Sequence, residues 1–172
     1  MTLQDFFKQY NKIALAFSGG ADSSYLLYEG TRSDSEVHAY YVKSAFQPQF
    51  ELEDAVKLAE QLNVSLTVLE LDVLSDSQIT QNPVNRCYYC KRKIFDKIME
   101  ASVADGCEVL IDGTNASDDV SDRPGMKALK ELQVHSPLRE CGITKEELRI
   151  RSKEAGLFTW NKPVSIIPVP SK

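Results

Sequence analysis

Short apolar runs alternate along the chain with longer segments in which apolar residues recur every three or four positions. The short runs are rich in β-branched and aromatic residues, a composition typical of strands whose two faces are both covered. The longer segments carry the apolar stripe of helices that pack on one side. We predict strands at residues 13–17, 36–42, 65–72 and 108–112, and helices at 23–30, 52–62 and 86–105. Strand and helix alternate three times, which predicts an α/β fold, an open parallel sheet with helices on both faces.

The remaining segments predict shorter elements around this sheet. An amphipathic helix is expected over the first dozen residues, and a polar loop at 115–125 leads to a short helix at 126–132. Thr144 and Glu147 have the spacing of a capping box, opening a helix that Gly156 closes. Three prolines after Trp160 exclude regular helix there. We expect one domain over 1–163 and an irregular tail over 164–172.

Composition narrows the class of protein. A length of 172 residues fits one domain, and the net charge of −5 argues against a general nucleic-acid binder. No run approaches the ~18 apolar residues of a membrane span. The N-terminus is acidic and polar where a signal peptide would be basic and apolar. We therefore expect a cytoplasmic location and no membrane.

The turn between the first strand and the next helix carries the main chemical signal. Ser18, Gly19 and Gly20 form a turn, and Asp22 and Ser23 open the helix. Glycines let the backbone approach a ligand closely, and the amides at a helix start attract an anion, most simply a phosphate. No lysine follows the glycines, so a standard P-loop is excluded. The alternative is an ordinary glycine turn between strand and helix.

Other polar residues follow the remaining predicted strands. Ser18, Ser44, Asp72 and Gly113 all come at strand ends, where open α/β sheets bind ligands. Gly113, Thr114 and Asn115 either bring amides and short polar side chains to a nucleotide or form a plain turn.

Charged residues near these turns are candidates for metal binding and phosphate binding. Asp22 and Asp118 are candidate magnesium ligands, because a hard cation prefers carboxylate oxygen. Asp22 is equally consistent with a carboxylate favoured by the helix dipole. Lys91 and Arg123 are candidate clamps for phosphate or carboxylate. For Lys91, a solvated helix face is the alternative.

The cysteines and histidines favour structural roles. Cys87 and Cys90 share one face of a helix start, which permits a zinc or iron–sulfur site, but no second close pair completes it. Packing is the favoured reading of both thiols. His38 and His135 have no obvious carboxylate or cysteine partner in the sequence and are read as structural.

The glycine turn resembles the SGGxDS loop of the N-type ATP pyrophosphatases, which hold ATP phosphates while a nucleophile attacks the α-phosphorus. Further segments extend the resemblance to the LarE family of ATP-dependent sacrificial sulfur transferases: NPVNRCYYCKRKIF, IDGTNASDD, DRPGMKAL, SPLRE and GLFTWNKP. The resemblance implies an adenine nucleotide alpha hydrolase-like (HUP-type) fold and ATP with magnesium. It also implies adenylylation of a carboxylate on a nicotinate-type mononucleotide, with release of pyrophosphate.

The resemblance also implies roles for single residues. Gly19, Gly20, Asp22 and Ser23 would hold pyrophosphate, Ser44 and Thr114 would lie at the nucleotide, and Arg123 at the substrate side.

The sequence departs from the family at two places. Ser121 stands where an acidic residue is usual, and Val164 to Lys172 follow Trp-Asn-Lys where the family has a cysteine and a Ser-Arg segment. We therefore expect the activating half of the reaction without its own sulfur donor. The alternative is a nucleotide-binding module or subunit that a partner chain or homo-oligomer completes. An amide-forming or tRNA-modifying pyrophosphatase shares the loop, but the sequence lacks glutaminase-type and RNA-binding segments.

Overall fold

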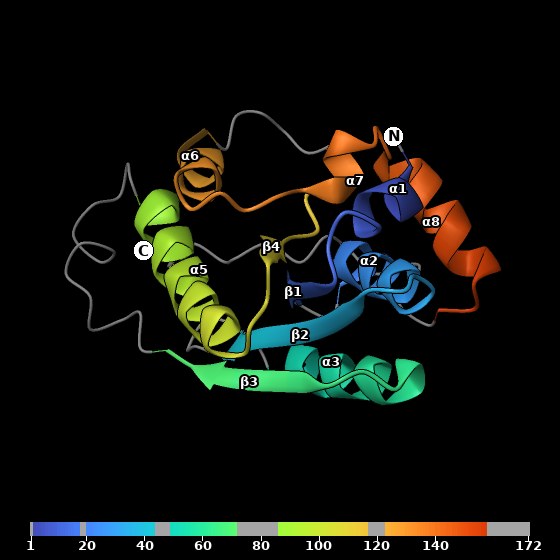
Figure 1. Cartoon of the computed structure of the whole chain (residues 1–172), viewed down its shortest axis with the longest axis horizontal. Coiled ribbons are helices and arrows are strands. Elements are labelled where there is room, and N and C mark those ends of the chain that lie inside the picture. Colours follow the sequence, from blue (N-terminus) through green and yellow to red (C-terminus); the bar gives the residue numbers. More distant parts are fainter. Residues whose placement is uncertain (1, 18–19, 44–48, 72–85, 117–122, 158–172) are drawn as a thin grey trace.

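A parallel sheet forms the centre of the chain (Figure 1). The computed structural model describes residues 2–17, 20–43, 49–71, 86–116 and 123–157. Within these ranges the sheet has four strands in the order β3-β2-β1-β4, and every pairing is parallel. The strands are β1 Lys12–Ala16, β2 Glu36–Lys43, β3 Leu66–Glu70 and β4 Val109–Ile111. The predicted open parallel sheet is confirmed.

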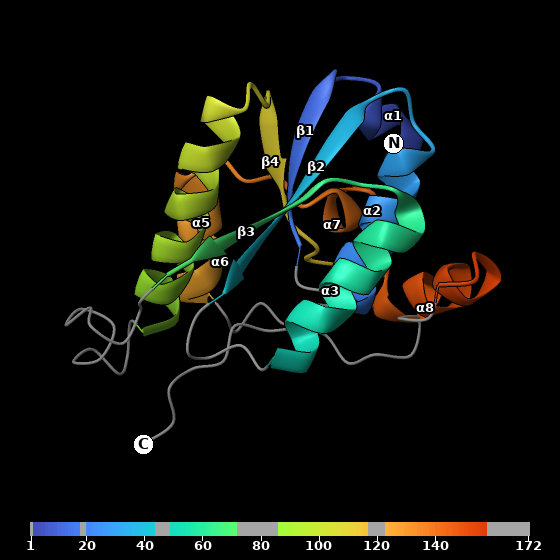
Figure 2. The ribbon, with the colours of Figure 1, turned by 90° about the horizontal axis from the view of Figure 1, so that it is seen from below.

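Helices cover both faces of the sheet (Figures 1 and 2). One face carries α5 Arg86–Ala104 and α6 Arg123–Glu131. The other face carries α2 Ala21–Thr31 and α3 Gln49–Leu62, with three shorter helices packed beside α2, namely α1 Leu3–Phe7, α7 Pro137–Glu140 and α8 Lys145–Glu154. Two separate hydrophobic cores result, one on each side of the sheet.

Alternation along β2 shows why residues 39–42 are all apolar or aromatic and buried. Successive side chains of a strand point to opposite faces. Tyr40 lies in the core under α5 and α6, whereas Tyr41 lies in the core under α2 and α3. Both rings are buried, and burial raises the pKa of both hydroxyls. A strand covered on both faces needs apolar bodies at consecutive positions.

Helix ends follow the signals in the sequence. Thr144 Oγ1 accepts a hydrogen bond of 3.3 Å from the Glu147 amide, which caps α8. Gly106 after α5 and Gly156 after α8 have φ of 83° and 77°, a conformation in which glycine has no steric penalty. Asn63, which follows α3, also has a positive φ, of 56°.

Three features of the region after β4 differ from the sequence prediction. Helix α6 begins at Arg123 and not at Met126. Pro124 lies in its first turn, where proline lacks only a hydrogen bond that the helix would not make. The short helix α7 was not predicted, and neither was the parallel bridge between Ile111 and His135, which extends the β4 side of the sheet.

Several predictions concern residues outside the described ranges. The tail expected at 164–172 and part of the polar loop expected at 115–125 lie there. Among the described residues, no helix combines the length and the apolar character needed to cross a lipid bilayer.

The packing of α8 generates a stability prediction with an internal control. Leu148 is fully buried and Ile150, on the same helix, is 55% exposed. Leu148→Ala should lower the free energy of unfolding by about 2–5 kcal/mol, because it removes buried methyl groups and leaves a cavity. Ile150→Ala should change it by less than about 0.5 kcal/mol. Urea denaturation measures both, and equal effects would show that α8 is not packed as described.

Candidate functional site

The strand order places the site at the carboxyl ends of β1 and β4. These strands are neighbours, with Leu15 opposite Ile111. The chain leaves β1 through α2 to reach β2 on one side, whereas β4 lies on the other side. Such a reversal in strand order opens a crevice between the two following loops, and ligands of open α/β sheets bind in it.

The first wall of this crevice is the start of α2. Gly20 is the N-cap residue, with φ −80° and ψ 176°, and Asp22 and Ser23 behind it are buried. Gly20 therefore needs no positive φ, and the lack of a side chain is what distinguishes it here. The first amides of a helix have no partner within the helix and lie at its positive end. This end of α2 suits an anion.

The second wall is the loop after β4, and it touches the first turn of α2. A Cβ atom added to Gly113 would lie 3.0 Å from the Ser23 amide nitrogen and 3.2 Å from the Asp22 Cβ. A side chain at position 113 would have to push the first turn of α2 away by a few tenths of an ångström. The structure thus brings Gly113 together with Asp22 and Ser23.

A buried carboxylate shapes this second loop. Asp112 accepts hydrogen bonds from Ser136 Oγ at 2.6 Å and from Thr114 Oγ1 at 2.8 Å. Burial raises the pKa of Asp112, and these hydroxyls together with the charge of Lys91 oppose the rise. Thr114, a predicted nucleotide contact, donates its hydroxyl hydrogen to Asp112. Its hydroxyl can therefore contact a ligand only as a hydrogen-bond acceptor.

Backbone hydrogen bonds from the segment around α7 hold the same loop. The Arg139 amide donates to the Thr114 carbonyl at 3.2 Å, and the Ala116 amide donates to the Ile143 carbonyl at 2.9 Å. The loop therefore has a fixed shape, although it belongs to no regular element.

The Asp22 carboxylate binds side chains from two other segments of the chain. Asn115 Nδ2 donates to its Oδ2 at 3.0 Å, and Lys145 Nζ donates to its Oδ1 at 2.6 Å. The side chains of Lys145 and Asp22 are only 16% and 8% exposed. The sequence did not predict the contact of either residue with Asp22. For Lys145 a signal was available, because a lysine in the first turn of a helix is disfavoured by the dipole and suggests a specific partner.

Lys91 adds a second positive charge on the α5 side. Its side chain is half-buried, and its charge lowers the pKa of Asp112. Lys91 is therefore within electrostatic range of Asp112, the residue that follows β4. Nearby, Arg92 Nη1 and Glu131 Oε1 form a 2.7 Å ion pair that ties α5 to α6, the helix that starts with Arg123.

Other predicted site residues cannot be placed. Ser18, Gly19, Ser44 and Asp118 lie outside the described residues, as do the side chains of Arg123, Cys87 and Cys90. In the part of the chain that is described, no group of three or more His, Cys, Asp or Glu side chains is arranged to hold a metal ion.

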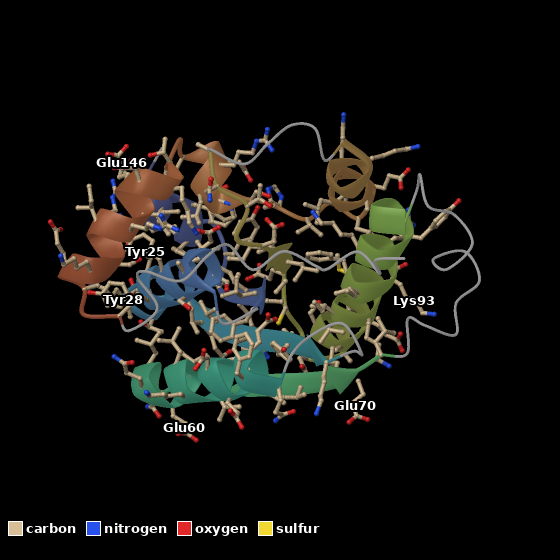
Figure 3. All side chains as sticks on the ribbon, turned by 180° about the vertical axis from the view of Figure 1, so that it is seen from behind. Tyr25, Tyr28, Glu60, Glu70, Lys93 and Glu146 are labelled. Carbon is tan, nitrogen blue, oxygen red and sulfur yellow. The ribbon has the colours of Figure 1, made fainter. Side chains whose placement is uncertain are left out.

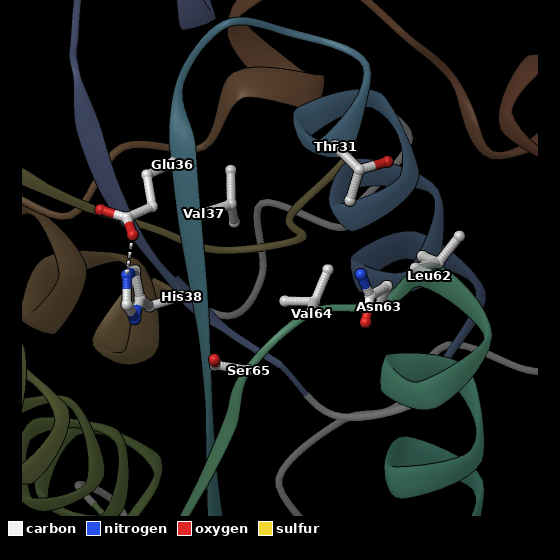
Figure 4. A pocket seen from close by; sticks show the side chains of 8 residues that line it. All are labelled: Thr31, Glu36, Val37, His38, Leu62, Asn63, Val64 and Ser65. Carbon is white, nitrogen blue, oxygen red and sulfur yellow. Dashed lines mark ion pairs between the residues drawn. The ribbon is translucent and has the colours of Figure 1, made fainter.

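A separate hollow lies at the opposite end of the strands, lined by the start of β2 and the ends of α2 and α3 (Figure 4). His38 lies at its edge, with Nε2 3.4 Å from Glu36 Oε1. His135 likewise has Nδ1 3.3 Å from Glu140 Oε2. His135 therefore has a carboxylate partner that the sequence did not reveal, whereas Nε2 of His38 is near Glu36 but makes no hydrogen bond within the described residues. Because the hollow is at the amino ends of the strands, it is not part of the crevice.

Sequence comparisons find a family model and known proteins that are similar to this chain. The family model described as queuosine biosynthesis protein QueC matches residues 12–94. Pyridinium-3,5-bisthiocarboxylic acid mononucleotide synthase of Lactiplantibacillus plantarum is 31% identical over 166 residues, which span 95% of this chain and 60% of that enzyme. An uncharacterised protein of Methanocaldococcus jannaschii is 31% identical over 179 residues, spanning 95% of this chain and 67% of that protein.

The fold has a match among solved structures. The U34-tRNA thiolase NcsA of Methanococcus maripaludis superposes with a TM-score of 0.67 at 20% identity, covering 99% of this chain and 67% of that one. The chain spans about 60% of the length of the first curated relatives that it matches.

The contact between the two loops can be tested at Gly113. Gly113→Ala places a methyl group 3.0 Å from a backbone nitrogen that cannot rotate away. We expect a loss of about 1–3 kcal/mol in the free energy of unfolding from overpacking. Urea denaturation checks this, with Ala116→Gly on the exposed end of the same loop as a control for local backbone changes. Unchanged stability of Gly113→Ala would mean that the loops do not touch.

Proposed function

Because this chain is a LarE-like member of the PP-loop ATP pyrophosphatase superfamily, we propose that it binds ATP in the crevice between β1 and β4. There it transfers AMP to a substrate carboxylate and releases pyrophosphate. The proposal concerns the activating half of a sulfur-transfer reaction, in which the carboxylate must become an acyl adenylate before sulfur can replace AMP.

One observation carries the proposal. The backbone of Gly113 lies against the Ser23 amide at the start of α2, so the loops after two adjacent strands form one surface at a helix N-terminus. A phosphate chain has several negative oxygens, and such a surface offers amide donors and a positive dipole. Lys91 and Lys145 add positive charge on its two sides. If the segment were only a turn between strand and helix, these two positive charges would have no anion to attract.

The proposed roles follow from these positions. Gly20, Ser23 and, beyond the described residues, Ser18 and Gly19 hold the β- and γ-phosphates. Thr114 and Ser44 lie at the rest of the nucleotide. Lys91 and Arg123 orient the phosphate or the attacking carboxylate from the α5 and α6 side.

The reaction is a substitution at the α-phosphorus. A carboxylate oxygen of the acceptor forms a bond to this phosphorus while the bond from phosphorus to the oxygen that bridges to the β-phosphate breaks. Pyrophosphate leaves with the electron pair. The chain's contribution is to hold both reactants in line and to stabilise the charge that grows on the leaving oxygen.

Magnesium is the cation that fits the donor chemistry. Asp22 supplies carboxylate oxygen at the edge of the phosphate surface, which is the ligand type that magnesium prefers. Asp118 is the second proposed ligand. When bound, magnesium would neutralise phosphate charge. In the described structure one Asp22 oxygen already contacts Lys145, so a cation bound to this oxygen has to displace the lysine.

The proposed acceptor class is a nicotinate-type mononucleotide. The relative from Lactiplantibacillus plantarum is named for a pyridinium mononucleotide that carries thiocarboxylic acids. Such an acceptor combines the carboxylate to be activated with a phosphate of its own. A partner chain or second copy that closes over the acceptor is part of the proposal.

Product analysis tests the activity. After incubation with ATP, magnesium and nicotinic acid mononucleotide, mass spectrometry should find pyrophosphate and an adenylylated acceptor or AMP from its hydrolysis. ATP binding without any of these products would reduce the chain to a nucleotide-binding module.

Gly20→Val tests the location of the phosphates in the same assay. A branched side chain at the N-cap blocks approach to the amides, so ATP affinity by calorimetry should fall at least about tenfold. The exposed substitution Val103→Ala on α5 is the control. Wild-type ATP affinity in a folded Gly20→Val protein would show that the phosphates do not bind at this loop.

A further inference from the structure

The contact between Lys145 and Asp22 joins two helix starts that are 123 residues apart in the sequence. Lys145 is the first residue of α8, and Asp22 lies in the first turn of α2. Nζ and Oδ1 are 2.6 Å apart, and both side chains are mostly buried. Two oppositely charged groups withdrawn from water in this way interact far more strongly than an exposed pair.

The packing of α8 fixes the lysine in this place independently of the ion pair. Leu148 is fully buried against the α2 side of the sheet. Arg151, one turn further along, hydrogen-bonds to Tyr25 of α2, and burial raises the pKa of that tyrosine to about 12. Figure 3 shows Tyr25 and Tyr28 on the part of α2 next to α8. Because these contacts pack α8 against α2, they position Lys145 next to Asp22.

The position is electrostatically unusual for a lysine. A cation at a helix N-terminus is repelled by the dipole, and here the start of α2 lies close as well. Glu146 and Glu147 in the first turn of α8 offset part of this repulsion. Asp22 therefore has an ammonium ion as neighbour at the place where the proposed function requires a metal cation.

The two oxygens of Asp22 have different partners. Oδ2 accepts from the neutral amide of Asn115, and Oδ1 accepts from the charged Lys145. A divalent cation on Oδ1 must compete with the ammonium group, because two positive charges cannot share one carboxylate oxygen without strong repulsion. The amide of Asn115 presents no such conflict.

We propose that Lys145 is the resident counter-cation of Asp22. It neutralises the carboxylate when no nucleotide is bound and makes the site a poor ligand for a bare divalent cation. A cation that arrives with nucleotide phosphates displaces it, since the phosphates supply a new anionic partner for the ammonium group. Lys145 is thus a positioning residue that selects the metal–nucleotide complex over the free metal. This inference rests on the proposed nucleotide site.

The test uses Mn²⁺ as a paramagnetic probe and measures binding, with no turnover involved. In Lys145→Met, Asp22 loses its counter-cation, so Mn²⁺ without nucleotide should bind at least about tenfold more tightly than to the wild type by electron paramagnetic resonance. Metal-free ATP should bind at least about tenfold more weakly, because Asp22 then lacks its ammonium neighbour and repels the phosphates more strongly. Damage to the fold would not tighten metal binding.

Two variants control for charge and position. Lys153→Met, on the exposed side of the same helix, should leave Mn²⁺ affinity unchanged. Asp22→Asn combined with Lys145→Met should abolish the gain, which assigns it to the Asp22 carboxylate. If Lys145→Met does not fold, Lys145→Gln removes the charge while keeping a hydrogen-bond donor for Asp22, and it should show the same gain.

The outcomes separate this inference from the proposed function. Equal Mn²⁺ affinity of the folded Lys145 variant and the wild type would overturn the counter-cation role. Failure of the wild type to bind Mn²⁺–ATP at all would instead overturn the nucleotide site itself.

Discussion

The carboxylate of Asp22 joins three segments of the chain at one point. Asp22 belongs to the first turn of α2, Asn115 follows β4, and Lys145 opens α8. All three side chains are largely withdrawn from water. Removing one partner of a buried charge costs more than the pair contributes, since the other charge stays buried. The start of α2, the loop after β4 and α8 therefore keep their relative positions through this group.

The sheet supplies the rigid base for that arrangement. Cores on both faces hold β1 and β4 side by side, so the loops that follow them start from fixed points. The loop after β4 is then held by Asp112, by Ser136 and by backbone hydrogen bonds from the segment around α7. Groups on a loop of fixed shape can contact a ligand without a further loss of conformational entropy, which suits the proposed alignment of two reactants.

Local patterns predicted the sheet and the first contact of the site, but they did not predict its charge pairs. The alternation of strand and helix, the stop at Gly156, and the approach of Gly113 to the first turn of α2 all arise from short-range preferences or from the rule for strand ends. The bonds of Asp22 to Asn115 and Lys145 span 93 and 123 residues. No periodicity carries such information. The start of α6 was missed although proline in a first turn was a readable signal.

The central claim is that a nucleotide binds at the carboxyl ends of β1 and β4. A titration of ¹⁵N-labelled protein with magnesium–ATP, followed by amide chemical shifts, tests it most directly. The account predicts the largest shifts at residues 20–24 and 113–115, with those around the hollow at Val37 and Asn63 unchanged. Shifts centred on that hollow, or saturating ATP without shifts at the start of α2, would contradict it.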